Sequence, residues 1–185
     1  MSTPWHRLCG YEGMSEREIR QFEKLRNAIR AHDLQQVQRL LDSGIDPRTQ
    51  AHRLLRDACD PMNPHQYEMV KLLLERGVDP NAQDPFSLRL ALFGNEQAQQ
   101  LAMECQWHPI LATLPTASVE LIQLLLEHGA DVYGLREHFW MSYGLAERHN
   151  PETARQKLQL LLRAGLPRDI PEVQEVIKEH PWVLE

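Results

Sequence analysis

The chain has 185 residues, of which 42% are hydrophobic and 25% charged, and its formal net charge is −6. These values are typical of one folded domain or one continuous repeat stack, and they exclude a disordered chain or a disulfide-rich miniprotein. The chain is acidic and has no block of basic residues that could follow a phosphate backbone, so no nucleic-acid partner is expected.

The sequence also lacks features of membrane and secreted proteins. Its apolar runs are too short to cross a bilayer, and its first ten residues have no apolar stretch typical of a signal peptide. The three cysteines, Cys9, Cys59 and Cys105, are odd in number and widely spaced, which argues against a disulfide framework or a zinc knuckle. We therefore expect a cytoplasmic protein with reduced thiols and no cofactor.

The first predicted element is a helix that begins near Glu16. Ser15 and Glu18 form a capping box, in which each side chain satisfies a free backbone N–H group of the other residue. The helix is expected to extend to about Arg30, and its many charged residues suit the outer face of a terminal repeat. Residues 1–14 are expected to form an N-terminal tail.

Four later segments resemble one another and align without gaps. Each has an aliphatic residue seven positions before a glycine, and leucines three and four positions before it. These positions share one face of a helix, and the glycine suits the left-handed residue that closes the last turn, so each segment is predicted to be a helix that ends at its glycine. The segments are VQRLLDSG at 37–44, VKLLLERG at 70–77, IQLLLEHG at 122–129 and LQLLLRAG at 158–165.

Turn residues follow these glycines. They read IDP at 45–47, VDPN at 78–81 and ADV at 130–132, and the match is weaker in the fourth copy, LP at 166–167. Helix and turn together resemble the ankyrin repeat, whose second helix ends in the pattern V-x-L-L-L-x-x-G-A-D-x-N. The first two glycines are 33 residues apart, which is the ankyrin period, whereas the next intervals are 52 and 36. One repeat is therefore expected to carry an insertion, or two repeats are merged there.

The first helices of the repeats are partly recognisable. Leu25, Ala28 and Val37, with HDL at 32–34 between them, match the ankyrin sequence L-H-x-A…G-H-L…V at every spacing, and LRDAC at 55–59 takes the same place in the second repeat. No repeat contains the T-P-L-H motif, whose threonine and histidine brace the hairpins. We therefore expect the hairpin loops to be short or degenerate.

The resemblance implies an all-α ankyrin-repeat solenoid of helix-turn-helix units over residues 15–185. The repeats are expected at about 15–50, 51–84, 85–135 and 136–168, with a capping helix at 171–180. In the third repeat, residues 87–91 would form the first helix, with an insertion near 93–110. An alternative places that helix at 104–114.

Motifs that carry chemistry are absent. The nine histidines are scattered without an H-E-x-x-H pair, and no glycine-rich phosphate loop occurs. Cys59 stands where ankyrin repeats have a small buried residue, which favours packing over reactivity. No catalytic or metal-binding residue is assigned. Two alternatives to a binding protein stay open: an enzyme or metal protein whose histidines converge in space, and a structural scaffold.

The resemblance implies that a partner protein is held by the hairpin tips and by the inner face of the first helices. Aromatic residues and arginine are favoured there because they dominate interface energetics. The expected insertion is a second candidate contact, although Trp107 could equally be a local hydrophobic anchor. The expected partner-binding residues are Asn27, Arg30, Gln50, Arg53, Gln83, Phe86, Trp107, His108, Tyr133, Leu135, Arg136 and His138.

The acidic net charge favours a partner with a basic surface through electrostatic steering. One concrete version is an inhibitor or immunity-type protein that masks a toxin or an enzyme. A monomer is expected.

Overall fold

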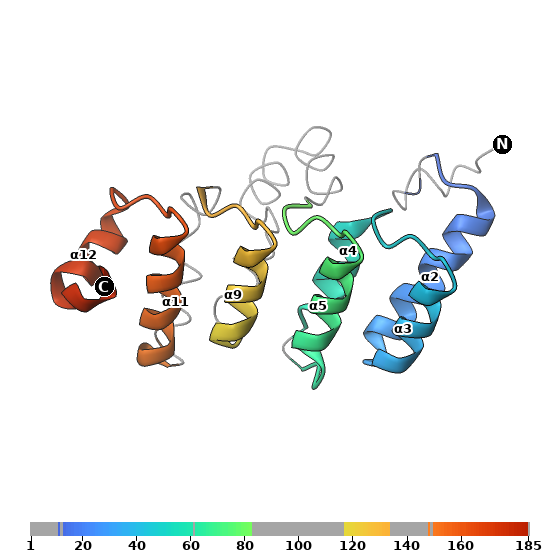
Figure 1. Cartoon of the computed structure of the whole chain (residues 1–185), viewed down its shortest axis with the longest axis horizontal. Coiled ribbons are helices and arrows are strands. Elements are labelled where there is room, and N and C mark those ends of the chain that lie inside the picture. Colours follow the sequence, from blue (N-terminus) through green and yellow to red (C-terminus); the bar gives the residue numbers. More distant parts are fainter. Residues whose placement is uncertain are drawn as a thin grey trace, which may run out of the picture. The chain divides into compact units, whose positions relative to one another are not determined.

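A computed structural model describes residues 11, 13–60, 62–82, 117–133, 148 and 150–184. The chain divides into two compact units, residues 1–107 and 108–185. Every regular element within the described ranges is a helix (Figure 1), which confirms the predicted all-α class.

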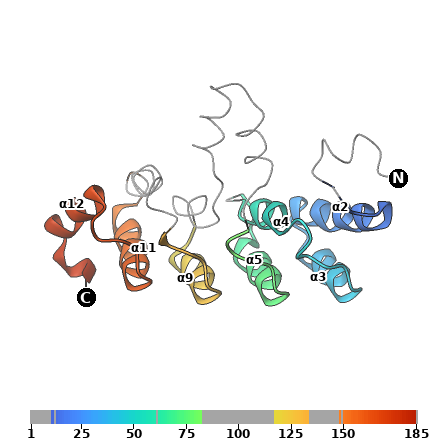
Figure 2. The same cartoon turned by 90° about the horizontal axis from the view of Figure 1, so that it is seen from above.

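The first unit contains two helix pairs. These are α2 (Glu16–Arg30) with α3 (Leu34–Asp42), and α4 (Ala51–Ala58) with α5 (Gln66–Glu75). The helices pack within each pair, and in addition α2 contacts α4 and α3 contacts α5. The first helices of the two pairs therefore form one layer and the second helices another, as Figure 2 shows from above.

Aliphatic side chains at helical spacing fill the space between these layers. Leu25 and Ile29 of α2, Leu54 of α4, and Met69 and Leu73 of α5 are fully buried. Burial of a side chain of this size contributes about 1.5–3 kcal/mol, so this shared core is the main source of stability for the helix pairs.

The second unit contains α9 (Val119–Glu127), α11 (Pro151–Arg163), α12 (Pro171–Glu179) and the short 3₁₀ helix η2 (Pro181–Leu184). Within this unit α9 packs on α11, and η2 packs on both α11 and α12 and buries Val183. Pro151 is the first residue of α11. Proline suits this position, because the N–H group that it lacks would have no helical acceptor there. The helix α12 occupies the place of the expected capping helix, and its role as a cap stays a prediction.

Four second helices end in the same backbone motif, as the glycine pattern predicted. After α3, the N–H of Gly44 donates to the carbonyl of Leu41 at 3.0 Å, and that of Ile45 donates to Leu40 at 3.4 Å. Equivalent pairs of bonds close α5, α9 and α11 at the other three glycines, all with positive φ. These bonds satisfy carbonyls that the helix itself leaves free, and the motif also ends α2, with His32 in place of glycine.

An aspartate follows three of the four glycine motifs and shapes the start of the next turn. Asp46, Asp79 and Asp131 each accept a hydrogen bond from the N–H group two residues further on, at 3.0, 2.8 and 2.8 Å. Such a bond replaces the carbonyl acceptor of an ordinary turn, so the chain leaves each of these helices in the same way. The turn at 45–50 then leads into α4 through Gln50, whose φ is +60°.

Candidate binding surface

The exposed side of α2 and α4 forms one continuous surface, because the two helices lie side by side. Positions 23, 26, 27 and 30 share one face of α2, and positions 53, 56 and 57 share one face of α4. We call this surface the α2–α4 face. It carries four arginines and two acids, and its residues are Glu23, Arg26, Asn27, Arg30, Arg53, Arg56 and Asp57.

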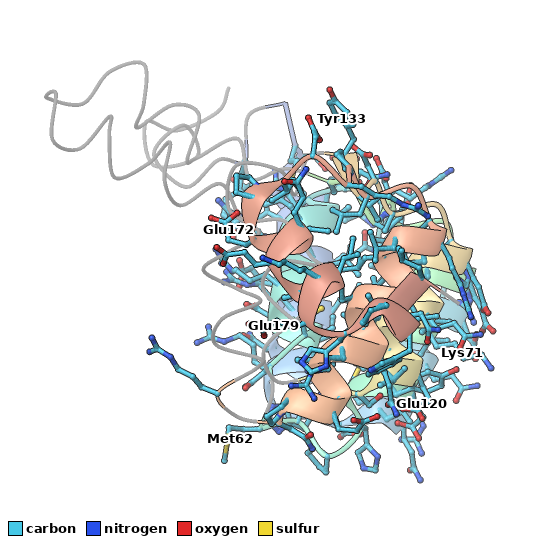
Figure 3. All side chains as sticks on the ribbon, turned by 90° about the vertical axis from the view of Figure 1, so that its left-hand side faces the viewer. Met62, Lys71, Glu120, Tyr133, Glu172 and Glu179 are labelled. Carbon is cyan, nitrogen blue, oxygen red and sulfur yellow. The ribbon has the colours of Figure 1, made fainter. Side chains whose placement is uncertain are left out.

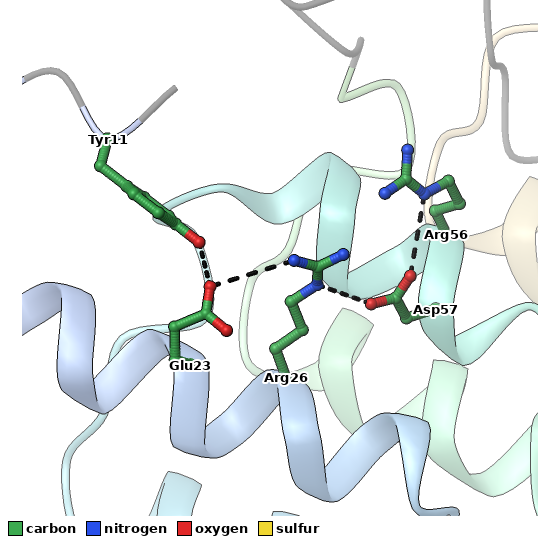
Figure 4. A network of polar contacts seen from close by, with 5 residues as sticks. All are labelled: Tyr11, Glu23, Arg26, Arg56 and Asp57. Atoms are coloured by element: carbon green, nitrogen blue, oxygen red, sulfur yellow. Dashed lines mark hydrogen bonds and ion pairs between the residues drawn. The ribbon is translucent and has the colours of Figure 1, made fainter. Parts of the chain in front are cut away.

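An ion-pair network joins the two helices (Figure 4). The Nε of Arg26 donates to Oδ2 of Asp57 at 2.7 Å, and their side chains are only 19% and 12% exposed. Arg56 approaches the other carboxylate oxygen of Asp57 at 3.7 Å, and Arg26 lies 3.9 Å from Glu23. Burial lowers the pKa of Arg26, but the bond to Asp57 and the nearby charges of Asp57 and Glu23 together raise it by more, so the pKa is raised and the guanidinium stays charged. The network fixes α2 against α4.

Tyr11 lies on this face although it precedes α2. Its ring meets the ring of Phe22 edge to face, with centroids 5.9 Å apart, and the guanidinium of Arg53 lies 5.2 Å from its centroid. Its hydroxyl donates to the carboxylate of Glu23 (Figure 4), and the residue is only 8% exposed. Burial raises the pKa of Tyr11, and the bond to Glu23 raises it further, so the phenol is a neutral donor.

The described parts of the hairpin tips present large polar or aromatic side chains. Arg48 forms a two-pronged contact with Asp46, with both N–O distances 2.9 Å, and this contact lowers the pKa of the carboxyl group. Tyr133 is 65% exposed and projects from the end of its turn (Figure 3). The aspartate bonds order the backbone beneath both side chains, so less backbone entropy would be lost when a partner binds them.

The predicted partner-binding residues divide into three groups. Asn27, Arg30 and Tyr133 are exposed. Gln50 and Arg53 are half-buried, and Arg53 contacts Tyr11 of the same chain. The other predicted residues lie outside the described ranges and are Gln83, Phe86, Trp107, His108, Leu135, Arg136 and His138.

Histidine and cysteine are the residue types most often used in metal sites and as nucleophiles. Within the described ranges, no group of three or more histidine, cysteine, aspartate or glutamate side chains could hold a metal ion. Cys59 is buried against the core, and burial raises the pKa of its thiol to about 12. The thiol is therefore neutral at physiological pH, which fits the predicted packing role.

Comparison with protein families agrees with this geometry. The ankyrin repeat family matches residues 54–85, which cover most of α4, all of α5 and the turn after it. No curated protein matches the chain. The chain therefore contains an ankyrin repeat at residues 54–85, and its described residues have an all-α fold of the ankyrin type. Ankyrin repeats are protein–protein interaction modules and are typically not enzymes. Among the described helices, none is long and apolar enough to cross a membrane.

Sequence reasoning missed two parts of the α2–α4 face. It placed Tyr11 in an N-terminal tail without assigning its contacts, and it assigned no role to Arg26 or Asp57, which are 31 residues apart. The sequence contains one clue to the ion pair. Arg26 and Asp57 each lie between the leucine and the alanine that align in the two first helices, at 25–28 and 55–58. The docking of Tyr11 leaves no periodic pattern in the sequence.

Proposed function

We propose that this protein binds a partner protein through the α2–α4 face and the hairpin tips. The observation that carries the proposal is the α2–α4 face itself, which places four arginines and an aromatic ring on two helices fixed by a half-buried ion pair. Arginine and tyrosine are the residue types that contribute most at interfaces, and a rigid surface loses little entropy on binding.

The chemistry of this face refines the kind of partner. The net charge of −6 favours a basic partner at long range, but the α2–α4 face presents Arg30, Arg53 and Arg56 to whatever touches it. A partner with a basic overall surface and an acidic or aromatic contact segment suits both features. We propose that the chain acts in the cytoplasm as a monomeric adaptor or inhibitor, of which an immunity-type protein is one version.

Affinity capture with matched variants tests the proposal. The full chain is used to isolate partners from the native cell, and the binding of each purified partner is then measured by calorimetry. We expect Arg30→Ala and Tyr133→Ala to weaken the binding of a true partner by tenfold or more. The same is expected of Trp107→Ala and Arg136→Ala, which change two predicted contact residues.

The controls are Gln38→Ala and Lys71→Ala, on exposed positions of the second helices α3 and α5. Because these helices form the other layer of the first unit, the controls should bind as the unmodified chain does. A partner that binds all six variants equally would show that the proposed surface is wrong.

A further inference from the structure

Tyr11 is contacted by the first unit in the way that a bound ligand is contacted by its site. Its contacts include three different interactions with side chains of α2 and α4: an edge-to-face contact with Phe22, a cation–π contact with Arg53 and a hydrogen bond to Glu23. We call these three residues the tyrosine cradle. Each interaction has its own geometry, and together they cover the ring and its hydroxyl.

The two helices that carry the cradle are held together by contacts that do not involve Tyr11. Phe22 and Glu23 are adjacent on α2, and Arg53 stands on the first full turn of α4. The two helices are held together by the fully buried Leu25 and Leu54 and by the 2.7 Å bond between Arg26 and Asp57, none of which involves Tyr11.

Tyr11 reaches the cradle through a short turn. The N–H of Met14 donates to the carbonyl of Tyr11 at 3.2 Å, and Gly13 between them has a φ of +80°. The capping box at Ser15 starts α2 immediately afterwards, with bonds that involve only Ser15 and Glu18. The start of α2 is therefore specified separately from the docking of Tyr11.

We propose that the tyrosine cradle is a recognition site for a tyrosine side chain, and that Tyr11 occupies it within the chain until a partner's exposed tyrosine replaces it. This inference rests on the proposed function, because it places the site on the face assigned to the partner. Tyrosine is preferred to phenylalanine, since only its hydroxyl can donate a hydrogen bond to Glu23. A segment held by a short tether has a high effective concentration, so the internal tyrosine weakens external binding without blocking it.

A peptide experiment tests the site without the partner. The probe is an end-blocked synthetic peptide with the sequence of residues 8–15 and serine in place of Cys9. It is titrated into the full-length Tyr11→Ala protein while amide NMR shifts are followed. We expect saturable shifts at Phe22, Glu23 and Arg53, and at least tenfold weaker binding to the unmodified chain, whose cradle is occupied.

Two controls define the specificity. A peptide with phenylalanine in place of the tyrosine should bind severalfold more weakly, and the double variant Tyr11→Ala/Arg53→Ala should lose most of the binding. Saturable shifts located elsewhere, or none at millimolar peptide, would overturn the proposal. So would loss of the helical circular dichroism signal in Tyr11→Ala, because Tyr11 would then be a structural part of the fold.

The result is separate from the test of the proposed function. If the peptide binds at the cradle but no captured partner requires Arg30 or Tyr133 for binding, the tyrosine site is supported and the proposed function is not. If a captured partner requires those residues but the peptide does not bind, the proposed function is supported and the tyrosine site is not.

Discussion

At the scale of single residues, His32 takes a backbone conformation that suits glycine. It closes α2 with a φ of +57°, whereas the second helices are closed by glycines such as Gly44, with a φ of +92°. A side chain in this region costs roughly 1 kcal/mol, because its Cβ crowds the following carbonyl. The 3.4 Å contact of His32 with Asp60 is partly exposed and offsets little of that cost.

We therefore predict that His32→Gly raises the free energy of unfolding by about 1 kcal/mol. Gly44→Ala should lower it by a similar amount, since no neighbouring atom lies within 4 Å of the new Cβ and only the backbone strain changes. Urea denaturation measures both. A loss of stability in His32→Gly would mean that the imidazole contributes more than the strain costs.

Cys59 gives a prediction for alkaline pH. Its pKa is about 12 in the folded state, against 9.0 for an unperturbed thiol. Above pH 9 the unfolded chain loses the thiol proton and the folded chain keeps it, so stability falls as pH rises from 9 towards 12. The fall should be on the order of 1 kcal/mol per pH unit, and Cys59→Ala should lack this part of it. Parallel stability curves for the two proteins between pH 8 and 11 would contradict the prediction.

At the scale of elements, two ion pairs join neighbouring helices and differ in burial. Arg26 and Asp57 link α2 to α4 with side chains 19% and 12% exposed, while Arg76, at the C-cap of α5, contacts Asp42 of α3 at 2.5 Å with 33% and 57% exposed. Water and salt screen the second pair more strongly.

Double-mutant cycles with alanine are expected to separate the two pairs. The coupling energy between Arg26 and Asp57 should be about 1–2 kcal/mol, because the two side chains share a charge-assisted hydrogen bond that is partly shielded from water. The exposed pair of Arg76 and Asp42 should give about 0.5 kcal/mol or less. Chemical denaturation at low and high salt measures both, and equal coupling energies would show that burial does not determine their strength.

The helices could be predicted from sequence more fully than the contacts between them. Helix ends depend on local chemistry, so Ser15 and the four glycines marked them correctly. The contact of Tyr11 with Arg53 and the bond between Arg26 and Asp57 depend on which helices become neighbours. That information lies in tertiary packing, and charged residues on a helix face ordinarily indicate only solvent.

At the scale of the whole molecule, charge acts at two distances. The net charge of −6 influences a partner from afar, although salt limits its range to about 8 Å under physiological conditions. Within contact range, the arginines of the α2–α4 face dominate. Salt should therefore slow association more than it speeds dissociation, which stopped-flow kinetics with the captured partner can measure. An equal effect of salt on both rates would count against this division.

The chain has two compact units, and each has its own buried leucines. Leu73 of α5 and Leu158 of α11 are both fully buried, so they form a matched pair of probes. Replacement of either by alanine should cost about 2–5 kcal/mol through lost burial and the cavity left behind.

We expect each substitution to act first on the helices that pack around it. Leu73→Ala should speed amide hydrogen exchange in α2 to α5, and Leu158→Ala in α9, α11 and α12, because contacts in repeat proteins are mainly between neighbours. Exchange followed by mass spectrometry resolves these segments. If either substitution speeds exchange equally in all of them, the chain unfolds as a single cooperative unit, and a stabilising substitution in one unit would then also protect the helices of the other.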